Sequence, residues 1–141
     1  MIPPVEAACE FRREIPANLA AVEEFCMSMR RWALSMQLPN RFPVELLTRE
    51  ALINAVVHGC ACDSSKKVAC VVRLRPGRVI IAVNDRSPGF NWRAVWKRTP
   101  ITDSCSGRGL AIIRQYAHRL RFNRCGNSLI MIKRLTKEGN R

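Results

Sequence analysis

The stretch that decides the fold is residues 50–58, which read Glu-Ala-Leu-Ile-Asn-Ala-Val-Val-His. On a helix Glu50, Asn54 and His58 lie four residues apart and share one face. The apolar residues of the segment fall largely on the other faces, where a core would contact them: Leu46, Leu47, Leu52, Ile53, Val56 and Val57. The sequence therefore predicts a well-buried helix with a narrow polar stripe. This stripe is either an ordinary amphipathic feature or a functional site, and its context must decide.

The length and composition indicate one folded domain spanning residues 1–141. A chain of 16.0 kDa can bury a substantial core, and 48% hydrophobic residues argue against disorder. No apolar run approaches the ~18 to 20 residues that a membrane span requires. Residues 1–10 lack the basic and apolar regions of a signal peptide. We expect a soluble cytoplasmic protein that does not bind membranes.

Seven cysteines without a Cys-x-x-Cys pair fit that location. In a reducing cytosol such thiols are usually small buried apolar groups. His58, Cys60 and Cys62 could be read as zinc ligands. Their spacing is tighter than in structural zinc sites and a second ligand pair is missing, so this reading is weak.

The net charge of +13 is unevenly distributed. Residues 1–58 hold six Arg and seven Glu, a net charge of −1, whereas residues 59–141 hold eighteen Lys and Arg against four acidic residues, a net charge of +14. The excess is either a solubilising surface or an attraction for an anionic partner. Residues 108–141 hold nine Lys and Arg and one Glu, so we expect at least one protein partner to present an acidic face.

The first half of the chain predicts one strand and two helices. Residues 8–15 alternate weakly and end at Pro16, as in a short edge strand. Asn18 can cap a first helix, which the Leu38-Pro39-Asn40 sequence ends. A second helix is expected from Pro43 to His58, with Gly59 as its C-cap.

The second half predicts four strands and one helix. The expected elements are strands at 67–74 and 79–84, a long loop at 85–106, a helix at 107–116, and strands at 120–124 and 128–134. This order predicts an α+β fold: a two-layer sandwich with a mostly antiparallel sheet covered by helices on one face.

Two further segments carry candidate site residues. Asp85 ends a predicted strand and leads into a turn at Pro88-Gly89; its carboxylate can accept a hydrogen bond from an amine such as that of adenine, or can cap its own loop as an Asx turn. The segment Gly107-Arg108-Gly109-Leu110 opens a predicted helix. Exposed N–H groups there can bind phosphate, although glycines also serve close packing.

In this order and context the three segments resemble those of the histidine-kinase-like ATPases of the GHKL superfamily, which share the Bergerat fold. More narrowly, the chain resembles the stand-alone anti-sigma factor serine kinases of the RsbW and SpoIIAB type. The resemblance extends from about Phe11 to Leu135. Residues 50–58 are similar to the N box of that family, 85–89 to its G1 box, and 107–110 to its G2 box.

The resemblance implies a role for each position of the N and G1 boxes. Asn54 would hold Mg²⁺ against the phosphates of ATP, and Glu50 would be the general base for an attacking serine hydroxyl. Asp85 would read the adenine amine, and Gly89 would admit the backbone close to the base. His58 would be either a partner of these groups or a packing residue.

For the G2 box the resemblance implies that Gly107, Arg108, Gly109 and Leu110 contact the phosphates, beneath a lid within 91–106. Two features depart from the family. Ser87 replaces a usual glycine of the G1 box, and its Cβ would crowd the adenine or require another backbone angle. The lid is short and holds Trp92 and Trp96, which would face the phosphates or a partner, or pack locally.

The function implied is that of an anti-sigma factor and protein-serine/threonine kinase. It would use ATP and Mg²⁺ to phosphorylate a STAS-type anti-sigma factor antagonist, would sequester a sigma factor, and would form a homodimer. An alternative is a catalytically weak interaction protein that acts only by sequestration. A nucleic-acid-binding module ranks third, because no helix-turn-helix, zinc-finger or aromatic platform is visible.

Overall fold

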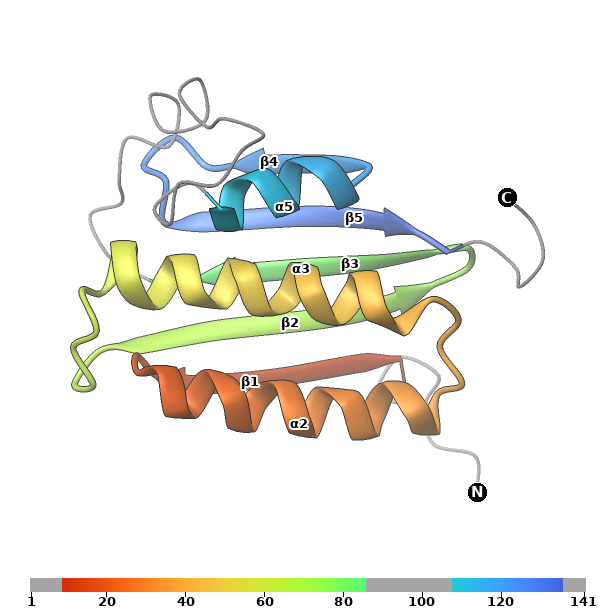
Figure 1. Cartoon of the computed structure of the whole chain (residues 1–141), viewed down its shortest axis with the longest axis horizontal. Coiled ribbons are helices and arrows are strands. Elements are labelled where there is room, and N and C mark those ends of the chain that lie inside the picture. Colours follow the sequence, from red (N-terminus) through yellow and green to blue (C-terminus); the bar gives the residue numbers. More distant parts are fainter. Residues whose placement is uncertain (1–8, 86–107, 136–141) are drawn as a thin grey trace.

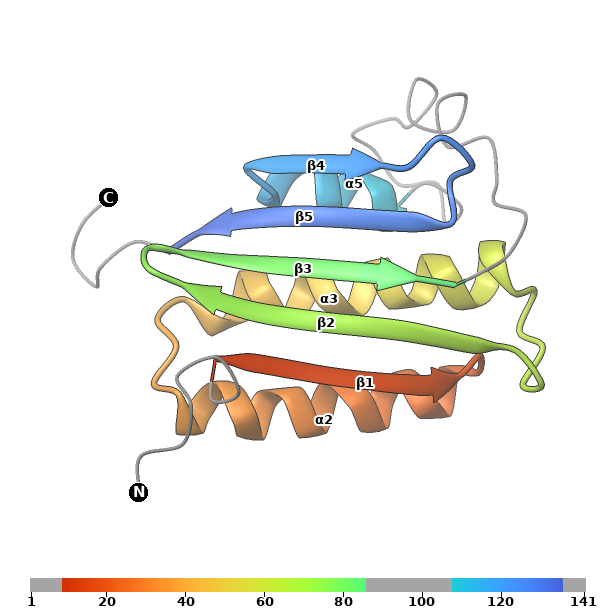
Figure 2. The same ribbon diagram turned by 180° about the vertical axis from the view of Figure 1, so that it is seen from behind.

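A computed structural model describes residues 9–85 and 108–135. Five strands form one sheet in the order β1-β2-β3-β5-β4, and every neighbouring pair is antiparallel. The strands are β1 (Glu10–Pro16), β2 (Lys67–Arg75), β3 (Arg78–Asn84), β4 (Arg119–Phe122) and β5 (Ser128–Arg134). The predicted α+β sandwich is confirmed: the helices lie on one face of the sheet, and no described element covers the other face (Figures 1 and 2).

The helical layer consists of α2 (Leu19–Ser35), α3 (Arg41–Asn54), the π-helical turn η1 (Ala55–Gly59) and α5 (Arg108–Tyr116). The α2 helix begins where predicted, because the side chain of Asn18 accepts a hydrogen bond from the backbone N–H of Ala21 at 2.8 Å. α3 lies between α2 and α5 and crosses the middle of the sheet (Figure 1). The central helix is thus the one that carries the polar stripe.

The core lies between the two layers and follows the alternation of the strands. Every second residue of β2 and β3 faces the helices and is buried, namely Val68, Cys70, Val72, Val79, Ile81 and Val83. From α3 the fully buried residues Leu47, Leu52 and η1's Val56 meet them, as predicted. Burying a side chain of this size contributes about 1.5 to 3 kcal/mol. The helix bearing the stripe is therefore held firmly against the sheet.

The second helix differs from the prediction at both ends. α3 begins at Arg41, two residues before Pro43, after Asn40 in a left-handed conformation (φ 54°). At its other end the α-helix stops at Asn54 and continues as the π turn, in which the N–H of Cys60 bonds the carbonyl of Ala55 at 2.9 Å. Gly59 is the last residue of this turn and Cys60 follows it as the C-cap, so the prediction that Gly59 is the C-cap is wrong.

The remaining boundaries agree with expectation within a few residues. The β2–β3 hairpin turns at Pro76-Gly77, where Gly77 adopts a φ of 73°, a conformation that glycine adopts readily. The predicted loop at 85–106 lies outside the described residues after Asp85. No helix of the described ranges is both long and apolar enough to cross a membrane.

Candidate functional site

Three chain segments that are distant in sequence meet at one edge of the sandwich. The C-terminal end of α3 with η1, the end of β3, and the start of α5 all lie at the left edge in Figure 1. The first carries Asn54 and His58, the second leads to Asp85, and the third begins at Arg108. The fold therefore brings the predicted N box, the beginning of the G1 box and the helical part of the G2 box together.

Asn54 combines partial burial with an unsatisfied polar atom. Its Nδ2 atom is buried and has no hydrogen-bond partner in the described part of the chain. A buried amide donor without a partner costs about 1 to 3 kcal/mol, which is a reason to look for a function. Glu50 lies one helical turn earlier and is also partly buried. The pair therefore places a carboxylate and an amide on one track of α3, as the sequence predicts.

Asp85 is one of two buried polar or charged residues in the described ranges, with 6% of its surface exposed. Its backbone N–H donates to the carbonyl of Asn127 at 3.0 Å, and its carbonyl accepts a weak contact from the thiol of Cys60 at 3.9 Å. The end of β3 is thus anchored on both sides. The backbone of Asp85 is therefore held at the edge of the core, where its side chain is buried.

Gly59 faces this carboxylate. A Cβ at residue 59 would lie 2.6 Å from Cγ of Asp85 and closer still to Oδ2, a separation that real Cβ atoms do not show. Only a residue without a side chain lets η1 approach Asp85 so closely. Gly59 is therefore a positioning residue that the sequence prediction missed. The sequence does show a glycine directly after His58, but we interpreted that glycine as the end of the helix.

Asn54 and Asp85 line the same small pocket. Its other lining residues come from α3, η1, β3 and the segment that joins β4 to β5: Ala51, Ala55, Val83, Phe122, Gly126, Asn127, Ser128 and Leu129. The pocket has a volume of about 20 Å³, which is room for a water molecule and not for a nucleotide. The pocket shows that Asn54 and Asp85 lie on the same small cavity.

The β4–β5 turn beside this pocket is fixed by one side chain. Oδ1 of Asn123 accepts hydrogen bonds from the backbone N–H groups of Gly126, Asn127 and Ser128 at 2.9, 3.0 and 3.1 Å. Gly126 has a φ of 80° there. The β4–β5 turn also holds Asp85, because the carbonyl of Asn127 accepts a hydrogen bond from the backbone N–H of Asp85. Asn123 is a second positioning residue that was not predicted from the sequence.

His58 does not continue the stripe as predicted. A π turn contains more residues than an α turn, so residues after Asn54 are rotated relative to an uninterrupted helix. Both Val57 and His58 are exposed, so the prediction that Val57 faces the core is wrong. π turns inside helices are frequently found at functional sites. The prediction that His58 contacts the cofactor stays a prediction.

The other predicted site residues are only partly described. Arg108, Gly109 and Leu110 form the first turn of α5, which agrees with the prediction that this segment opens a helix. Their side chains, together with Ser87, Gly89, the lid residues and Gly107, lie outside what the structure describes. The described site is therefore the half formed by α3, η1, β3 and the β4–β5 turn.

The described residues contain no group of three His, Cys, Asp or Glu side chains that could hold a metal ion. Cys60 in particular is fully buried, and burial raises the pKa of its thiol, with the Asp85 carboxylate as a smaller cause in the same direction. A thiol of this kind is a poor zinc ligand, since zinc binds the thiolate. These properties disfavour the zinc interpretation of His58, Cys60 and Cys62.

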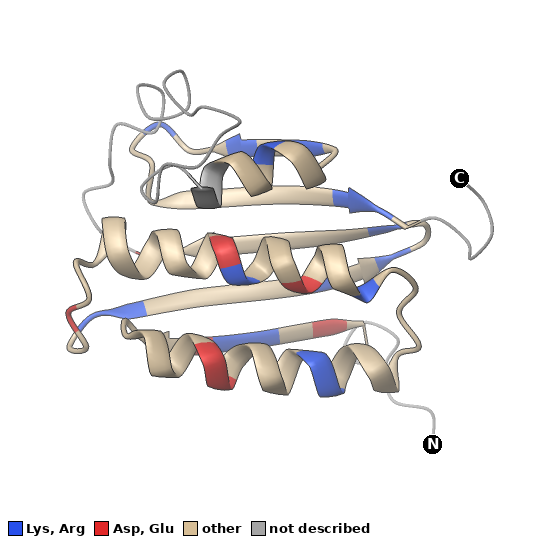
Figure 3. Cartoon of the chain, viewed as in Figure 1, with Lys and Arg blue, Asp and Glu red and all other residues tan. Residues whose placement is uncertain are grey.

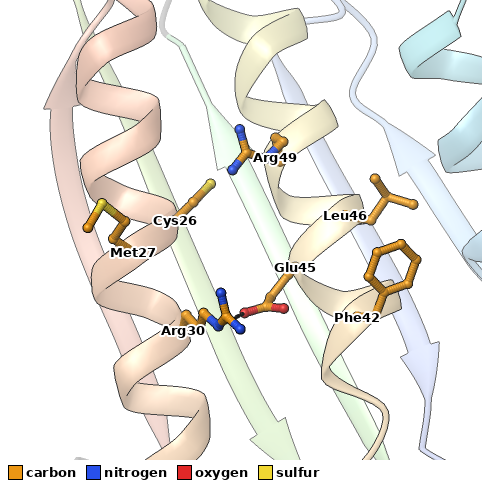
Figure 4. Close-up of a pocket in the computed structure, with 7 residues that line it drawn as sticks. All are labelled: Cys26, Met27, Arg30, Phe42, Glu45, Leu46 and Arg49. Atoms are coloured by element: carbon orange, nitrogen blue, oxygen red, sulfur yellow. Dashed lines mark ion pairs between the residues drawn. The ribbon is translucent and has the colours of Figure 1, made fainter.

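A second hollow, of about 230 Å³, lies in the helical layer between α2 and α3 (Figure 4). Its lining residues are Cys26, Met27, Arg30, Phe42, Glu45, Leu46 and Arg49. Arg30 pairs with Glu45 at 3.7 Å, and Arg49 pairs with Glu23 on the neighbouring helix. Oε1 of Glu45 takes part in the ion pair with Arg30 but, like Nδ2 of Asn54, is buried and has no hydrogen-bond partner in the described part of the chain.

Comparison with known proteins identifies a family for this arrangement. The family model described as "Histidine kinase-like ATPase domain" matches residues 15–133, which is most of the chain. The match covers all of α2, α3, β2 and β3, and hence the described half of the site. A search of curated proteins gives no match.

Proposed function

Because this chain belongs to the histidine kinase-like ATPase family, we propose that it binds ATP with Mg²⁺ at the edge formed by α3, η1, β3 and α5. One observation supports this site most strongly. The unpartnered buried amide of Asn54 lies one turn from Glu50 and lines the same pocket as the buried carboxylate of Asp85. A phosphate group beside Asn54 would give its Nδ2 atom an acceptor, and an amine of the nucleotide base would lie beside the carboxylate of Asp85.

The donor set fits a magnesium nucleotide. Mg²⁺ prefers oxygen ligands and keeps several waters, so one amide oxygen from Asn54 is a suitable protein ligand. With its oxygen on the metal, the Nδ2 group of Asn54 would be free to donate to a phosphate oxygen, which removes its deficit. The bound ion would neutralise charge on the phosphates during transfer. The carboxylate of Asp85 would accept from the exocyclic amine of adenine.

We further propose that the reaction is phosphoryl transfer to a serine hydroxyl. Glu50, one helical turn from the metal ligand, would accept the proton of the attacking hydroxyl, a role that needs a carboxylate within hydrogen-bond reach. The N–H groups at the start of α5 would hold phosphate oxygens. Positioning and charge neutralisation supply most of the catalysis in such reactions, and this arrangement provides both.

The partners proposed are those that the resemblance to the anti-sigma factor kinases implies. The serine would belong to a STAS-domain antagonist, a sigma factor would be sequestered, and the protein would act as a homodimer. Support for this finer function comes from the residues that resemble the N, G1 and G2 boxes of those kinases. The alternative, sequestration without efficient turnover, is favoured by Ser87 at a position where the family carries glycine.

The deciding experiment is calorimetric titration of the protein with ATP and MgCl₂. Binding should be lost in both Asn54→Ala and Asp85→Asn. Asn18→Ser, which retains an N-cap oxygen on α2, and Asp63→Asn in an exposed loop are matched controls and should bind normally. Absence of binding by the wild-type protein would refute the nucleotide site.

The finer function has its own test. The protein, radiolabelled ATP and purified STAS-domain proteins of the same organism should yield phosphoserine on one of them. If ATP binds but no STAS-domain protein is labelled, the site is an ATPase or sequestration site and the kinase proposal fails.

A further inference from the structure

The face of the sheet that points away from the helices carries an unusual set of side chains. Strand alternation assigns to this open face the residues between the buried ones. They include eight basic residues, Arg12, Lys67, Arg73, Arg75, Arg78, Arg119, Arg121 and Arg134, but only two acidic residues, Glu10 and Glu14. Figure 2 shows that no described helix or strand packs on this side.

The centre of the open face is aliphatic. Val71, Ala82 and Ile130 are neighbours in register across β2, β3 and β5, and Ile80 pairs with Ile132 in the row beside them. Ile130 is 44% exposed, which is high for an isoleucine in a central strand. The other four residues are half-buried and still reach the surface. A contiguous apolar patch with a polar rim is typical of protein interaction sites.

One end of the open face holds a row of like charges. Arg75 of β2 pairs in register with Arg78 of β3, and Arg78 pairs with Arg134 of β5. The blue ends of these three strands lie together in Figure 3. Like charges directly opposite in a sheet are destabilising. None of the three arginines forms an ion pair with a described carboxylate, whereas Arg73 near the β1 edge pairs with Glu10 at 2.6 Å.

We propose that this open face is a docking surface for a protein partner whose carboxylates surround an aliphatic patch. The aliphatic centre supplies the desolvated contact, and the arginine row selects an acidic rim. The surface lies on the opposite side of the sheet from Asn54 and Asp85, so the partner can bind while the candidate nucleotide site is accessible. This inference does not depend on the proposed ATP chemistry.

Two other occupants fit the surface less well. A second copy of the chain would bring one basic face against another, and like-charge juxtaposition opposes association. A nucleic acid would satisfy the arginines but would leave the aliphatic centre uncovered. Sheets that bind single strands stack bases on aromatic side chains, and the outward positions of the described strands hold none.

The test uses a labelled 18-residue helical peptide in which glutamates flank a leucine stripe. Its scrambled form and an 18-nucleotide oligothymidine are the comparison probes, and binding to the full chain is followed by fluorescence anisotropy. We expect the amphipathic peptide to bind at least tenfold more tightly than the scrambled peptide. Arg78→Glu should weaken it at least fivefold, and Ile130→Ser severalfold. Arg31→Glu, with the same charge change on the exposed side of α2, should alter it less than twofold.

A stability measurement separates the proposal from simple loss of fold. Arg78→Glu converts a row of three like charges into two opposite-charge pairs, so its melting temperature should rise while peptide binding falls. The proposal is overturned if the two peptides bind equally, or if neither binds. It is also overturned if oligothymidine alone binds and loses affinity in Arg78→Glu, or if sedimentation shows a dimer that this substitution dissociates.

Discussion

Gly59 and the carboxylate of Asp85 are in direct contact across the edge of the core, one from the π turn and one from the end of β3. The contact couples a helical segment to a strand through a residue that has no side chain. We expect Gly59→Ala to destabilise the protein by about 1 to 3 kcal/mol, the usual range for overpacking. Intrinsic helix propensity alone would favour alanine at a helical position, so a loss would come from the contact.

A double-mutant cycle, measured by chemical denaturation, isolates this contact. Asp85→Ala removes the atoms that a Cβ at residue 59 would meet, so Gly59→Ala should cost little in that background. Additive effects of the two substitutions would show that the crowding has another source. Gly77→Ala is the comparison at a glycine with open space around its Cβ position but with a positive φ. Its cost should not depend on residue 85.

Glu50→Gln should separate nucleotide binding from turnover. The amide retains the size of the carboxylate but cannot accept a proton, so turnover should fall by about 10²- to 10⁴-fold. ATP affinity by calorimetry should change little, because Asn54, the proposed metal ligand, is intact. Formation of ADP under single-turnover conditions is the readout, with Glu24→Gln on the exposed side of α2 as the control. Unchanged ADP formation would rule out Glu50 as the base.

Asn54→Ala should lose ATP binding without losing stability. The substitution removes the buried Nδ2 group that has no partner in the described ranges, so the usual penalty of deleting a polar side chain is absent. Its melting temperature should equal or exceed that of the wild-type protein. Thr48→Val is the contrasting change, since the hydroxyl of Thr48 already donates to the carbonyl of Val44 at 2.8 Å. A clear destabilisation by Asn54→Ala would show that its amide is satisfied.

His118 should make stability fall in mild acid. His118 is exposed, but desolvation by its neighbours, then the charges of Lys133 and Arg134, lower the pKa of this imidazole. Its Nδ1 accepts the N–H of Arg134 at 3.1 Å. The unfolded chain therefore binds the proton first, near pH 6.5. The contribution is fully present above that pH and is lost as the pH falls toward the lower folded pKa. Denaturant midpoints between pH 7.5 and 5.5 should depend less on pH in His118→Gln.

The six described cysteines should differ in how fast they react with a thiol reagent, because they differ in exposure. Cys62 and Cys125 are exposed, while Cys26, Cys60 and Cys70 are buried. Burial raises the pKa of each of the three buried thiols, most strongly at Cys70. We expect iodoacetamide to label Cys62 and Cys125 first, as read by peptide mass spectrometry. Early labelling of Cys60 would show that η1 opens, and with it the contact to Asp85.

Much of this architecture follows from local signals in the sequence. Asn18 predicts the start of α2 because a side-chain oxygen there satisfies a free N–H, and the alternation in β2 and β3 predicts which faces are buried. Glu50 and Asn54 share one face of α3, as predicted, because residues four apart are neighbours on any α-helix. These features depend on neighbours a few residues away, which a sequence displays directly.

The features that were missed depend on contacts between distant segments. The role of Gly59 arises from Asp85, 26 residues away, and the row of Arg75, Arg78 and Arg134 arises from strand register. The sequence shows an excess of basic residues after residue 58, but which of them are neighbours depends on the pairing of β3 with β5. The π turn is defined by a backbone hydrogen bond between residues five apart, and no residue type specifies this spacing.

The π turn has a consequence for how the N box tolerates change. Because η1 accommodates more residues per turn than α3, the orientation of His58 relative to Asn54 is set by how many residues lie between them. Substitutions at Ala55, Val56 or Val57 alter packing but leave this count intact. Deleting a single residue there would remove the π turn and change the orientation of His58 about the helix axis. The number of residues between Asn54 and His58, more than the chemistry of the side chains between them, therefore sets the orientation of His58.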